Sequence, residues 1–228
     1  MKTAKLFTLI LACCASNAMA QWEMGIGINA IAPQGQLSQS NYPWGIGGDL
    51  TLLSPSILNK ESDLQLQFGL NFGGSDNGRK KFNTNGQFED GSLDFYNCIG
   101  NVHSTARLTL KPHPRFGFFA EAIGGYSFVH SGIIEETLKD DSYNYNHKKI
   151  NTTHMFRYGG GLGASYYFNH FFHLDLRVDY TTGGPVEFID MSTTNRTEDG
   201  YTFERKQSTT SELLTIQLRA SWLLISNQ

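Results

Sequence analysis

The chain has 228 residues, a formal net charge of −3, 39% hydrophobic residues and only 17% charged ones. An acidic chain of this length is one domain or one barrel, and it is no basic nucleic-acid binder. Beyond residue 20, no segment approaches the ~18 consecutive apolar residues of a membrane-spanning helix. Residence in a membrane would therefore require a closed β-barrel.

Residues 1–20, MKTAKLFTLILACCASNAMA, predict a secretory signal peptide cleaved after Ala20. Two lysines precede a short apolar run, and an A-x-A site follows. A lipoprotein signal ending at Cys13 is the alternative. Cleavage after Ala20 leaves a domain of residues 21–228 with a net charge of −5, because the segment removed holds two lysines and no acid. Cys98 is then the only cysteine, so no internal disulfide can form.

Eight segments alternate between apolar residues and small or polar ones, which is the pattern of a strand with two unlike faces. In the clearest, FFHLDLRVDY, every second residue is apolar. Phe119 and Ile123 are exceptions to the alternation in the fifth segment. In chain order the segments lie near 22–32, 44–53, 64–72, 105–110, 116–128, 156–168, 171–180 and 214–224.

A soluble sandwich with one wet face would alternate in the same way. The polar face here carries Gly, Ser, Gln, Asn and Thr around a few acids and arginines, with almost no lysine. Gly159, Gly161 and Gly163 share that face. Since glycine weakens a strand, this row indicates a crowded interior that leaves room for Arg177 and Arg219. A narrow eight-stranded barrel is just wide enough to be filled by side chains.

Charge is sorted by strand face, with all the strand arginines and acids on one side. An arginine on the lipid face costs about 2–4 kcal/mol at mid-membrane. Four arginines would cost roughly 8–16 kcal/mol, as much as the ~5–15 kcal/mol that stabilises a whole domain. We therefore expect the charged face to be the inside. The predicted interior charge network comprises Glu23, Asp49, Arg107, Glu121, Arg157, Asp175, Arg177, Asp179 and Arg219.

Long polar connections alternate with short ones along the chain. Strands six and seven are separated by Asn169-His170, and strands four and five by Pro112-His113-Pro114. Long stretches follow strands three, five and seven. Long outer loops and tight periplasmic turns are typical of outer-membrane barrels. With eight strands, both ends of the chain are expected on the periplasmic side.

The run GGGLGASYYFNHFFHLDLRVDY (159–180) resembles the penultimate hairpin of small outer-membrane barrels. These are the OmpA/OmpX/opacity-like proteins and especially the "outer membrane protein beta-barrel domain" group of the Bacteroidetes. The resemblance implies an all-β, eight-stranded antiparallel up-and-down barrel in a Gram-negative outer membrane. Its partners would be outer-membrane lipid and the barrel-assembly machinery. Many such barrels end in a phenylalanine, whereas this chain ends LLISNQ.

Aromatic residues lie near the predicted strand ends, where the interfacial girdles of a membrane barrel belong. Aromatic residues are common in any strand, which is the alternative explanation. The predicted interfacial set comprises Trp22, Trp44, Tyr166, Phe168, Phe171, Tyr180 and Trp222.

No catalytic, cofactor or metal site is predicted. The loose dinucleotide pattern at 25–30 lies on a strand with no helix after it, and the seven histidines form no metal-binding motif. His173 shares the charged face with Asp175 and is expected to join the interior network. Barrel enzymes that modify envelope lipid need a His, a Ser and an acid together. The neighbours in His103-Ser104 and His130-Ser131 instead point to opposite faces of a strand.

The long connections 74–100, 132–155 and 183–208 are candidates for binding an extracellular partner. Residues 141–153 (DSYNYNHKKINTT) alternate, which would let strands five and six continue above the membrane and offer an edge for strand addition. Solvated loops are the alternative. The sequence favours an outer-membrane barrel with a filled, non-porin interior and a structural or surface-interaction role. The alternatives are an enzyme acting on envelope lipid and a secreted soluble barrel that binds a small apolar ligand.

Overall fold

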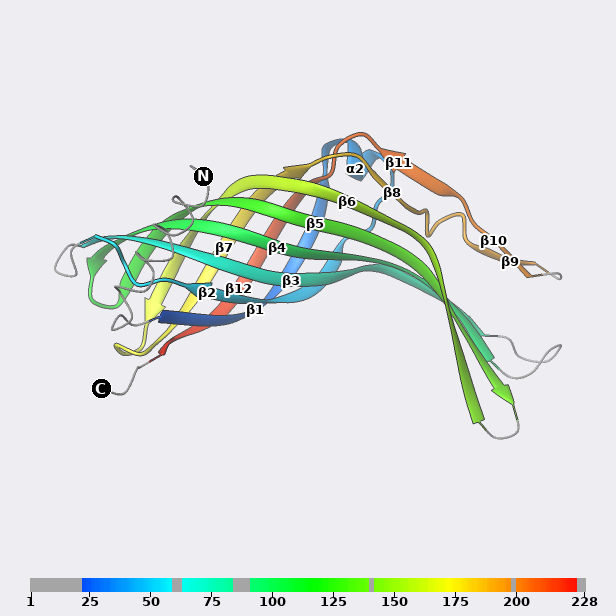
Figure 1. Ribbon diagram of the computed structural model, residues 1–228, viewed down its shortest axis with the longest axis horizontal. Coiled ribbons are helices and arrows are strands. Elements are labelled where there is room, and N and C mark those ends of the chain that lie inside the picture. Colours follow the sequence, from blue (N-terminus) through cyan, green and yellow to red (C-terminus); the bar gives the residue numbers. More distant parts are fainter. Residues whose placement is uncertain (1–21, 59–62, 84–90, 140–141, 198–199, 225–228) are drawn as a thin grey trace, which may run out of the picture.

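A computed structural model describes residues 22–58, 63–83, 91–139, 142–197 and 200–224. The predicted signal peptide and the lipoprotein alternative at Cys13 lie outside the described residues. Eight antiparallel strands form a closed barrel in the order β1-β12-β7-β6-β5-β4-β3-β2, which confirms the predicted all-β fold (Figure 1). Among the described residues, no helix is both long and apolar enough to cross a membrane.

The barrel strands are β1 (Trp22–Gln34), β2 (Gly45–Leu53), β3 (Leu64–Asn83), β4 (Gly91–His113), β5 (Phe116–Lys139), β6 (Ser142–Tyr167), β7 (Phe172–Gly183) and β12 (Glu212–Leu224). A short helix follows the first strand, α2 (Gly35–Gln39). The connection from β7 to β12 contains two small hairpin sheets built from β8 (Val186–Ile189), β9 (Asn195–Thr197), β10 (Gly200–Thr202) and β11 (Arg205–Ser208).

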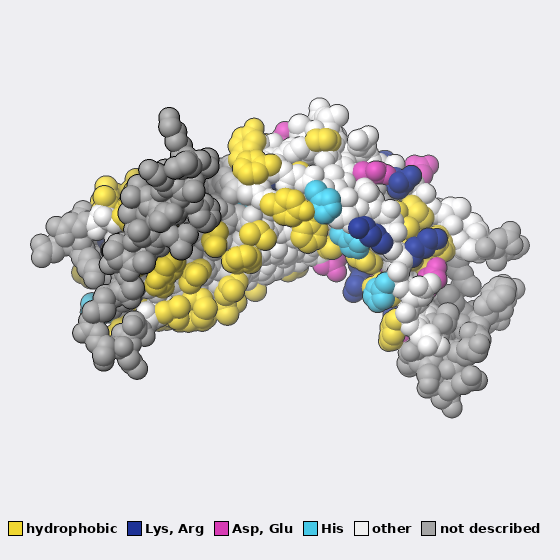
Figure 2. Space-filling model, viewed as in Figure 1, with side chains coloured by type: hydrophobic (Ala, Val, Ile, Leu, Met, Phe, Trp, Pro, Cys, Tyr) yellow, Lys and Arg dark blue, Asp and Glu magenta, His cyan; other side chains and the backbone are white. Residues whose placement is uncertain are grey.

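The alternation places apolar side chains outside the barrel and charged ones inside. On β7, Leu176 is 55% exposed, whereas its neighbours Asp175 and Arg177 are 0% and 8% exposed. Hydrophobic side chains gather over the barrel half of the molecule (Figure 2). Soluble monomers rarely expose a continuous apolar surface of this kind, and hydrocarbon is the solvent that suits it. The molecule is therefore a membrane-spanning barrel of the outer-membrane type.

The apolar outer surface of the barrel forms a belt, and the predicted interfacial aromatics lie at its two ends. Trp44 precedes β2 and Tyr180 lies near the end of β7, at the end that carries the long connections. The ring of Tyr166 lies 4.8 Å from that of Phe168 at the opposite end. That opposite end also carries the start of β1, the end of β12 and the short turns from β4 to β5 and from β6 to β7, so we assign it to the periplasm. Its members of the predicted set are Trp22, Tyr166, Phe168, Phe171 and Trp222.

Four of the strands are about twice as long as a membrane requires. β3, β4, β5 and β6 have 20, 23, 24 and 26 residues, whereas β1, β2, β7 and β12 have 13, 9, 12 and 13. A tilted strand crosses a bilayer with about 9–11 residues. The surplus forms a four-stranded sheet that bends away beyond the barrel (Figure 1). We call this sheet the arm and define it as residues 77–83, 91–98, 130–139 and 142–156.

The arm corrects one interpretation of the long connections. The described residues of regions 74–100 and 132–155 are mostly strand and not solvated loops, because β3 to β6 continue with their pairing intact, as the alternation of residues 141–153 indicated for β5 and β6. Register shifts occur between Asp76 and Arg79 on β3, and between Ser131 and Gly132 on β5. Gly78 takes a φ of +86° in the first of them, a backbone conformation that glycine adopts without a steric cost.

The inner face of the arm has the opposite chemistry to the inner face of the barrel. Leu93, Phe95 and Ile133 continue the inward parity of Arg107 and Glu121, yet they are apolar and buried. Their cover is the connection from β7 to β12, residues 184–211, which we call the lid. Ile189 of the lid is buried in the same cluster, and aromatic side chains of the lid pack against it. The described residues of region 183–208 therefore include a part that packs on the arm.

The glycines of the interior make room for other side chains, although not for those predicted. A Cβ on Gly163 would overlap the ring of Phe119. It is Gly25 on β1 that faces Arg219, whose Cδ would lie 2.6 Å from an added Cβ. The interior is crowded as expected, but the expectation that the glycine row of β6 accommodates Arg177 and Arg219 was wrong. A sequence pattern shows which face is crowded and not which strand lies across from it.

We expect Gly163→Ala to lower the free energy of unfolding by about 1–3 kcal/mol, because overpacking a filled interior forces its neighbours out of place. The added methyl group would meet both the Phe119 ring and the backbone oxygen of Leu176. Gly124→Ala is the control, since its Cβ would lie 3.7 Å from Phe156 on the outer face. Urea unfolding of the barrel in lipid vesicles measures both, and equal stabilities would contradict the packed interior.

Candidate functional site

The centre of the barrel holds a lattice of charged side chains around Arg107. Its Nε donates to Glu121 at 2.5 Å and its Nη1 to Asp175 at 3.0 Å. Its guanidinium also lies 4.0 Å from the ring centre of Phe119, one of the two residues that broke the sequence alternation. Arg107 is 2% exposed. A buried charge is tolerable only when it is paired in this way.

The lattice extends from Arg107 towards both ends of the barrel. Arg219 donates to Asp175 from Nε at 3.2 Å. Arg177 donates to Glu121 at 2.8 Å and forms an ion pair with Asp179 at 2.6 Å. Each of two central carboxylates thus serves two guanidiniums, in the chain Arg219, Asp175, Arg107, Glu121, Arg177 and Asp179. All nine residues predicted for the interior network are inside the barrel, at 8% exposure or less.

Asp49 and Arg157 belong to the buried set but form no ion pair among the described residues. Asp49 accepts hydrogen bonds from three polar side chains, Thr51, Asn71 and Gln217. Arg157 donates to the carbonyl oxygen of Ser211 at 3.0 Å and to its hydroxyl group at 3.1 Å. At these two positions, neutral partners take the place of an opposite charge.

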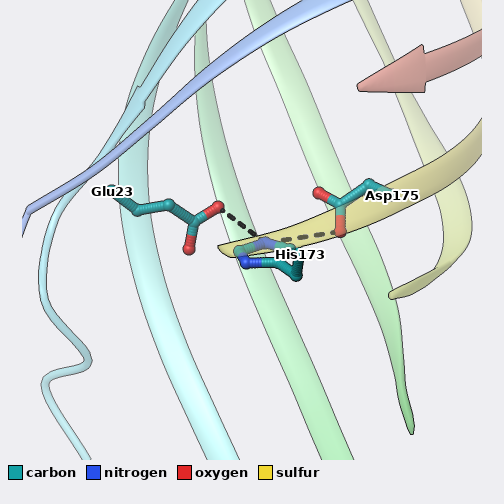
Figure 3. Close-up of side chains that lie close together, drawn as sticks. All are labelled: Glu23, His173 and Asp175. Atoms are coloured by element: carbon teal, nitrogen blue, oxygen red, sulfur yellow. Dashed lines mark ion pairs between the residues drawn. The ribbon is translucent and has the colours of Figure 1, made fainter. Parts of the chain in front are cut away.

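Glu23, His173 and Asp175 meet at the periplasmic end of the lattice (Figure 3). Nε2 of His173 lies 3.3 Å from Oε1 of Glu23 and 3.5 Å from Oδ1 of Asp175. One imidazole and two carboxylates, with their ligand atoms within 4.8 Å of one another, form a possible donor set for a metal ion. Arg107 and Arg219 already donate to Asp175, so a metal ion would lie beside two buried guanidiniums. The two carboxylates are therefore better suited to contact the His173 imidazole than to hold a metal ion together with it.

A cavity of about 560 Å³ lies at the periplasmic mouth of the barrel. Glu23 and His173 line it, so this end of the lattice is reachable from the periplasmic side. The cations Lys111 and Arg115 also line it, and the Lys111 ammonium lies 4.2 Å from the ring centre of Tyr167. Charged, polar and aromatic side chains line the mouth together, and the cavity bordered by Asp49 and Arg177 in the interior above it has a volume of only about 40 Å³.

A histidine–serine pair that the sequence did not indicate lies in the upper barrel. Nε2 of His103 is 2.9 Å from Oγ of Ser127, and both residues are buried. Ser104 points to the outer face, as the strand alternation requires. The pair borders a cavity of about 40 Å³, which has room for on the order of three water molecules. A hydroxyl group and a base are therefore present without space for a lipid substrate.

The lid is fastened to the arm by Asn97, which is fully buried. Its side-chain amide donates to the carbonyl oxygen of Ile189 at 2.9 Å and accepts from the N–H of the same residue at 3.2 Å. The hydroxyl group of Ser131 donates to the same Asn97 oxygen at 2.6 Å. The Asn97 side chain thus makes the two backbone hydrogen bonds with Ile189 that a neighbouring strand would otherwise make.

Charged side chains make further contacts between and within the arm and the lid. Lys80 of the arm donates to the carbonyl oxygens of Met191 at 3.3 Å and Thr194 at 2.7 Å. Within the lid, Lys206 lies 2.6 Å from Asp190. Burial acts to raise the pKa of Asp190, but hydrogen bonds from Lys206 and Ser192 outweigh it and hold this pKa below its ordinary value. The lid is therefore ordered by polar as well as apolar contacts.

Sequence reasoning missed Asn97 and Lys80 as structural residues of the arm. The signal that could have found Asn97 is the continued alternation of residues 92–99, SLDFYNCI, in which Leu93, Phe95 and Ile99 share one parity. Because a polar Asn interrupts that apolar parity, the pattern indicates a buried amide with a specific partner.

The sequence matches no protein-family model and no curated protein. Among solved structures, Neisserial surface protein A is similar, with 11% identity, a TM-score of 0.46, and coverage of 90% of this chain and 97% of that one. A major outer membrane protein from Thermus thermophilus has 13% identity, a TM-score of 0.45, and coverage of 89% and 99%. Ail of Yersinia pestis has 11% identity, a TM-score of 0.36, and coverage of 90% and 97%. At these values the likeness carries no argument, and the membrane assignment rests on the geometry of the barrel.

Proposed function

We propose that this outer-membrane barrel holds a stiff sheet outside the cell, where the sheet binds an extended segment of an extracellular partner. The observation that carries the proposal is the length of β3 to β6, which exceeds what a bilayer needs by about ten residues or more in each strand. An anchor alone needs no such extension. The arm is also braced, since the lid packs on its inner face and Asn97 fixes the lid in place.

The open edge of β6 is the part of the arm best suited to a partner. β7 pairs with β6 only from Arg157 onwards, and β8 approaches it near Asn151 and Thr153. The residues 144–149 between that contact and the tip are exposed. An exposed edge strand is a template for strand addition. Lys148 and Lys149 add positive charge there, so we propose a partner segment with acidic side chains.

Site-specific photo-crosslinking on intact cells tests this role. A benzophenone amino acid at Asn146 is expected to yield a discrete adduct with the partner, and the same group at the lipid-facing Leu218 is expected to yield none. The Lys148→Glu/Lys149→Glu variant should abolish the adduct, whereas Arg115→Glu, on the periplasmic turn, should leave it unchanged. An adduct that survives the double charge reversal, or no adduct from an arm that protease digestion shows to be outside, overturns the proposal.

The interior supports the proposal that the barrel is no porin. Its largest fully buried side chains are arginines, which fill the lumen of a narrow barrel. Planar-bilayer recordings of the purified protein are expected to show no discrete conductance steps. Conductance that is abolished when the lumen is blocked by a bulky label would contradict this part of the proposal and leave the binding role of the arm to its own test.

A further inference from the structure

Six buried polar atoms that have no hydrogen-bond partner belong to residues lining one small cavity in the upper barrel. The cavity has a volume of about 40 Å³. A buried polar atom without a partner costs free energy, so such atoms are few in native proteins. Their concentration around one cavity points to an occupant that the chain does not supply. The six atoms are the side-chain oxygens Oδ1 of Asn29, Oδ1 of Asn101, Oδ1 of Asp179 and Oε1 of Gln217, and Nε of Arg157 and of Arg177.

The cavity lies at the boundary between the charged lattice and an apolar layer. Asp49 and Arg177 line it on the side of the lattice. Ile31, Ile99 and Leu213 line it as well, and they belong to the apolar cluster that α2 and β8 complete at the outer end of the barrel. The space is therefore placed between two packed layers of the interior.

Glycines in the barrel wall have no side chain, and the side chains that line the cavity occupy the space left free. A Cβ on Gly73 would lie 2.7 Å from Oδ1 of Asn101 and 3.0 Å from Cβ of Asp49. A Cβ on Gly27 would likewise overlap the amide of Gln217. The polar lining of the cavity is thus formed by residues of several strands.

We propose that this cavity binds a cluster of about three water molecules, the number that its volume holds, and that these waters connect Arg157 to Asp179. The unpartnered atoms include four acceptors and two guanidinium donors, and water is the small species that serves both kinds. A cation would lie beside Arg157 and Arg177, and an anion beside Asp49 and Asp179, so either ion meets like charge. The water cluster supplies a partner for the one buried arginine that has no carboxylate.

Crystals of the folded full-length barrel test the nature of the occupant. We expect water density within hydrogen-bond distance of the free oxygens of Asn29, Asn101 and Gln217. Soaks in rubidium and in bromide should give no anomalous peak in the cavity, and pressurised xenon should not enter it. An anomalous rubidium or bromide peak would show an ion site, and bound xenon would show a dry cavity, and each of these results overturns the proposal.

The Asn29→Leu variant tests the same inference in solution. If waters occupy the cavity, the variant removes one of their partners and lowers the urea midpoint of unfolding. If the cavity is dry, it removes an unpartnered polar atom and raises the midpoint. Asn144→Leu on the exposed arm is the control for the change of residue type, and its midpoint should be unaltered. A raised or unchanged midpoint for Asn29→Leu would count against the water cluster.

Discussion

Arg107→Met is expected to lower the free energy of unfolding by about 3–5 kcal/mol, the usual cost of removing one partner from a buried ion pair. Glu121 keeps Arg177 and Asp175 keeps Arg219, but both carboxylates lose the guanidinium that lies between them. The Phe119 ring also loses its cation. Urea unfolding in lipid vesicles, followed by tryptophan fluorescence and by the gel mobility of unboiled samples, measures the loss.

Two further variants separate the charge effect from the change in shape. Arg115→Met, at an exposed turn, should change the stability by less than about 0.5 kcal/mol. Arg107→Met combined with Glu121→Gln should be more stable than Arg107→Met alone, because neutralising Glu121 removes one of the carboxylates left in excess, while Arg177 still pairs with Asp179. If Arg107→Met proves as stable as Arg115→Met, the lattice contributes nothing to folding.

The barrel could be foreseen from the sequence because strand alternation depends only on neighbouring residues. FFHLDLRVDY has one apolar and one charged parity, and the structure places its Leu176 outside and its Asp175 inside. The sorting of arginines then decides which face meets lipid, since the free-energy cost of the reverse arrangement is as large as the stability of a domain. No knowledge of distant contacts is needed for either step.

Partners within the interior could not be foreseen, because they depend on register and on side-chain reach. Arg107 contacts Asp175, 68 residues away in the chain. Arg157 has a face and a charge like those of the other arginines, yet its neighbours are hydroxyl and carbonyl groups. Alternation assigns a side chain to the inside but gives neither its height in the barrel nor the strand it faces.

The extension of β5 and β6 was foreseen from the alternation of residues 141–153, but the matching extension of β3 and β4 was missed for a different physical reason. Inside the membrane the inward parity is polar, whereas beyond the membrane the same parity is apolar at Leu93, Phe95 and Ile133. The inversion occurs because the inner face there packs on the lid, and the outer face meets water. The contact that makes this possible, Asn97 with Ile189, spans 92 residues of sequence. A stretch that looks like a polar loop with scattered aromatics is thus a strand whose cover comes from elsewhere.

Leu176→Arg is expected to lower the free energy of unfolding in lipid vesicles by about 2–4 kcal/mol, the cost of an arginine on the lipid face near mid-membrane. Leu176 lies in the middle of β7 on the outer face, paired with Leu218 of β12 and 55% exposed. Tyr145→Arg on the arm is the matched control, because Tyr145 is 61% exposed but lies outside the barrel.

The comparison distinguishes lipid from water as the surroundings of the apolar belt. In water, both substitutions place a charge at an exposed position, and surface changes of this kind usually alter stability by less than about 0.5 kcal/mol. In lipid, only the Leu176 variant has to bring its charge into hydrocarbon. A large loss at Leu176 with no loss at Tyr145 is therefore the result expected of a membrane barrel. Small and equal effects at the two positions would mean that the belt faces water, and the inward placement of the four arginines would then need another cause.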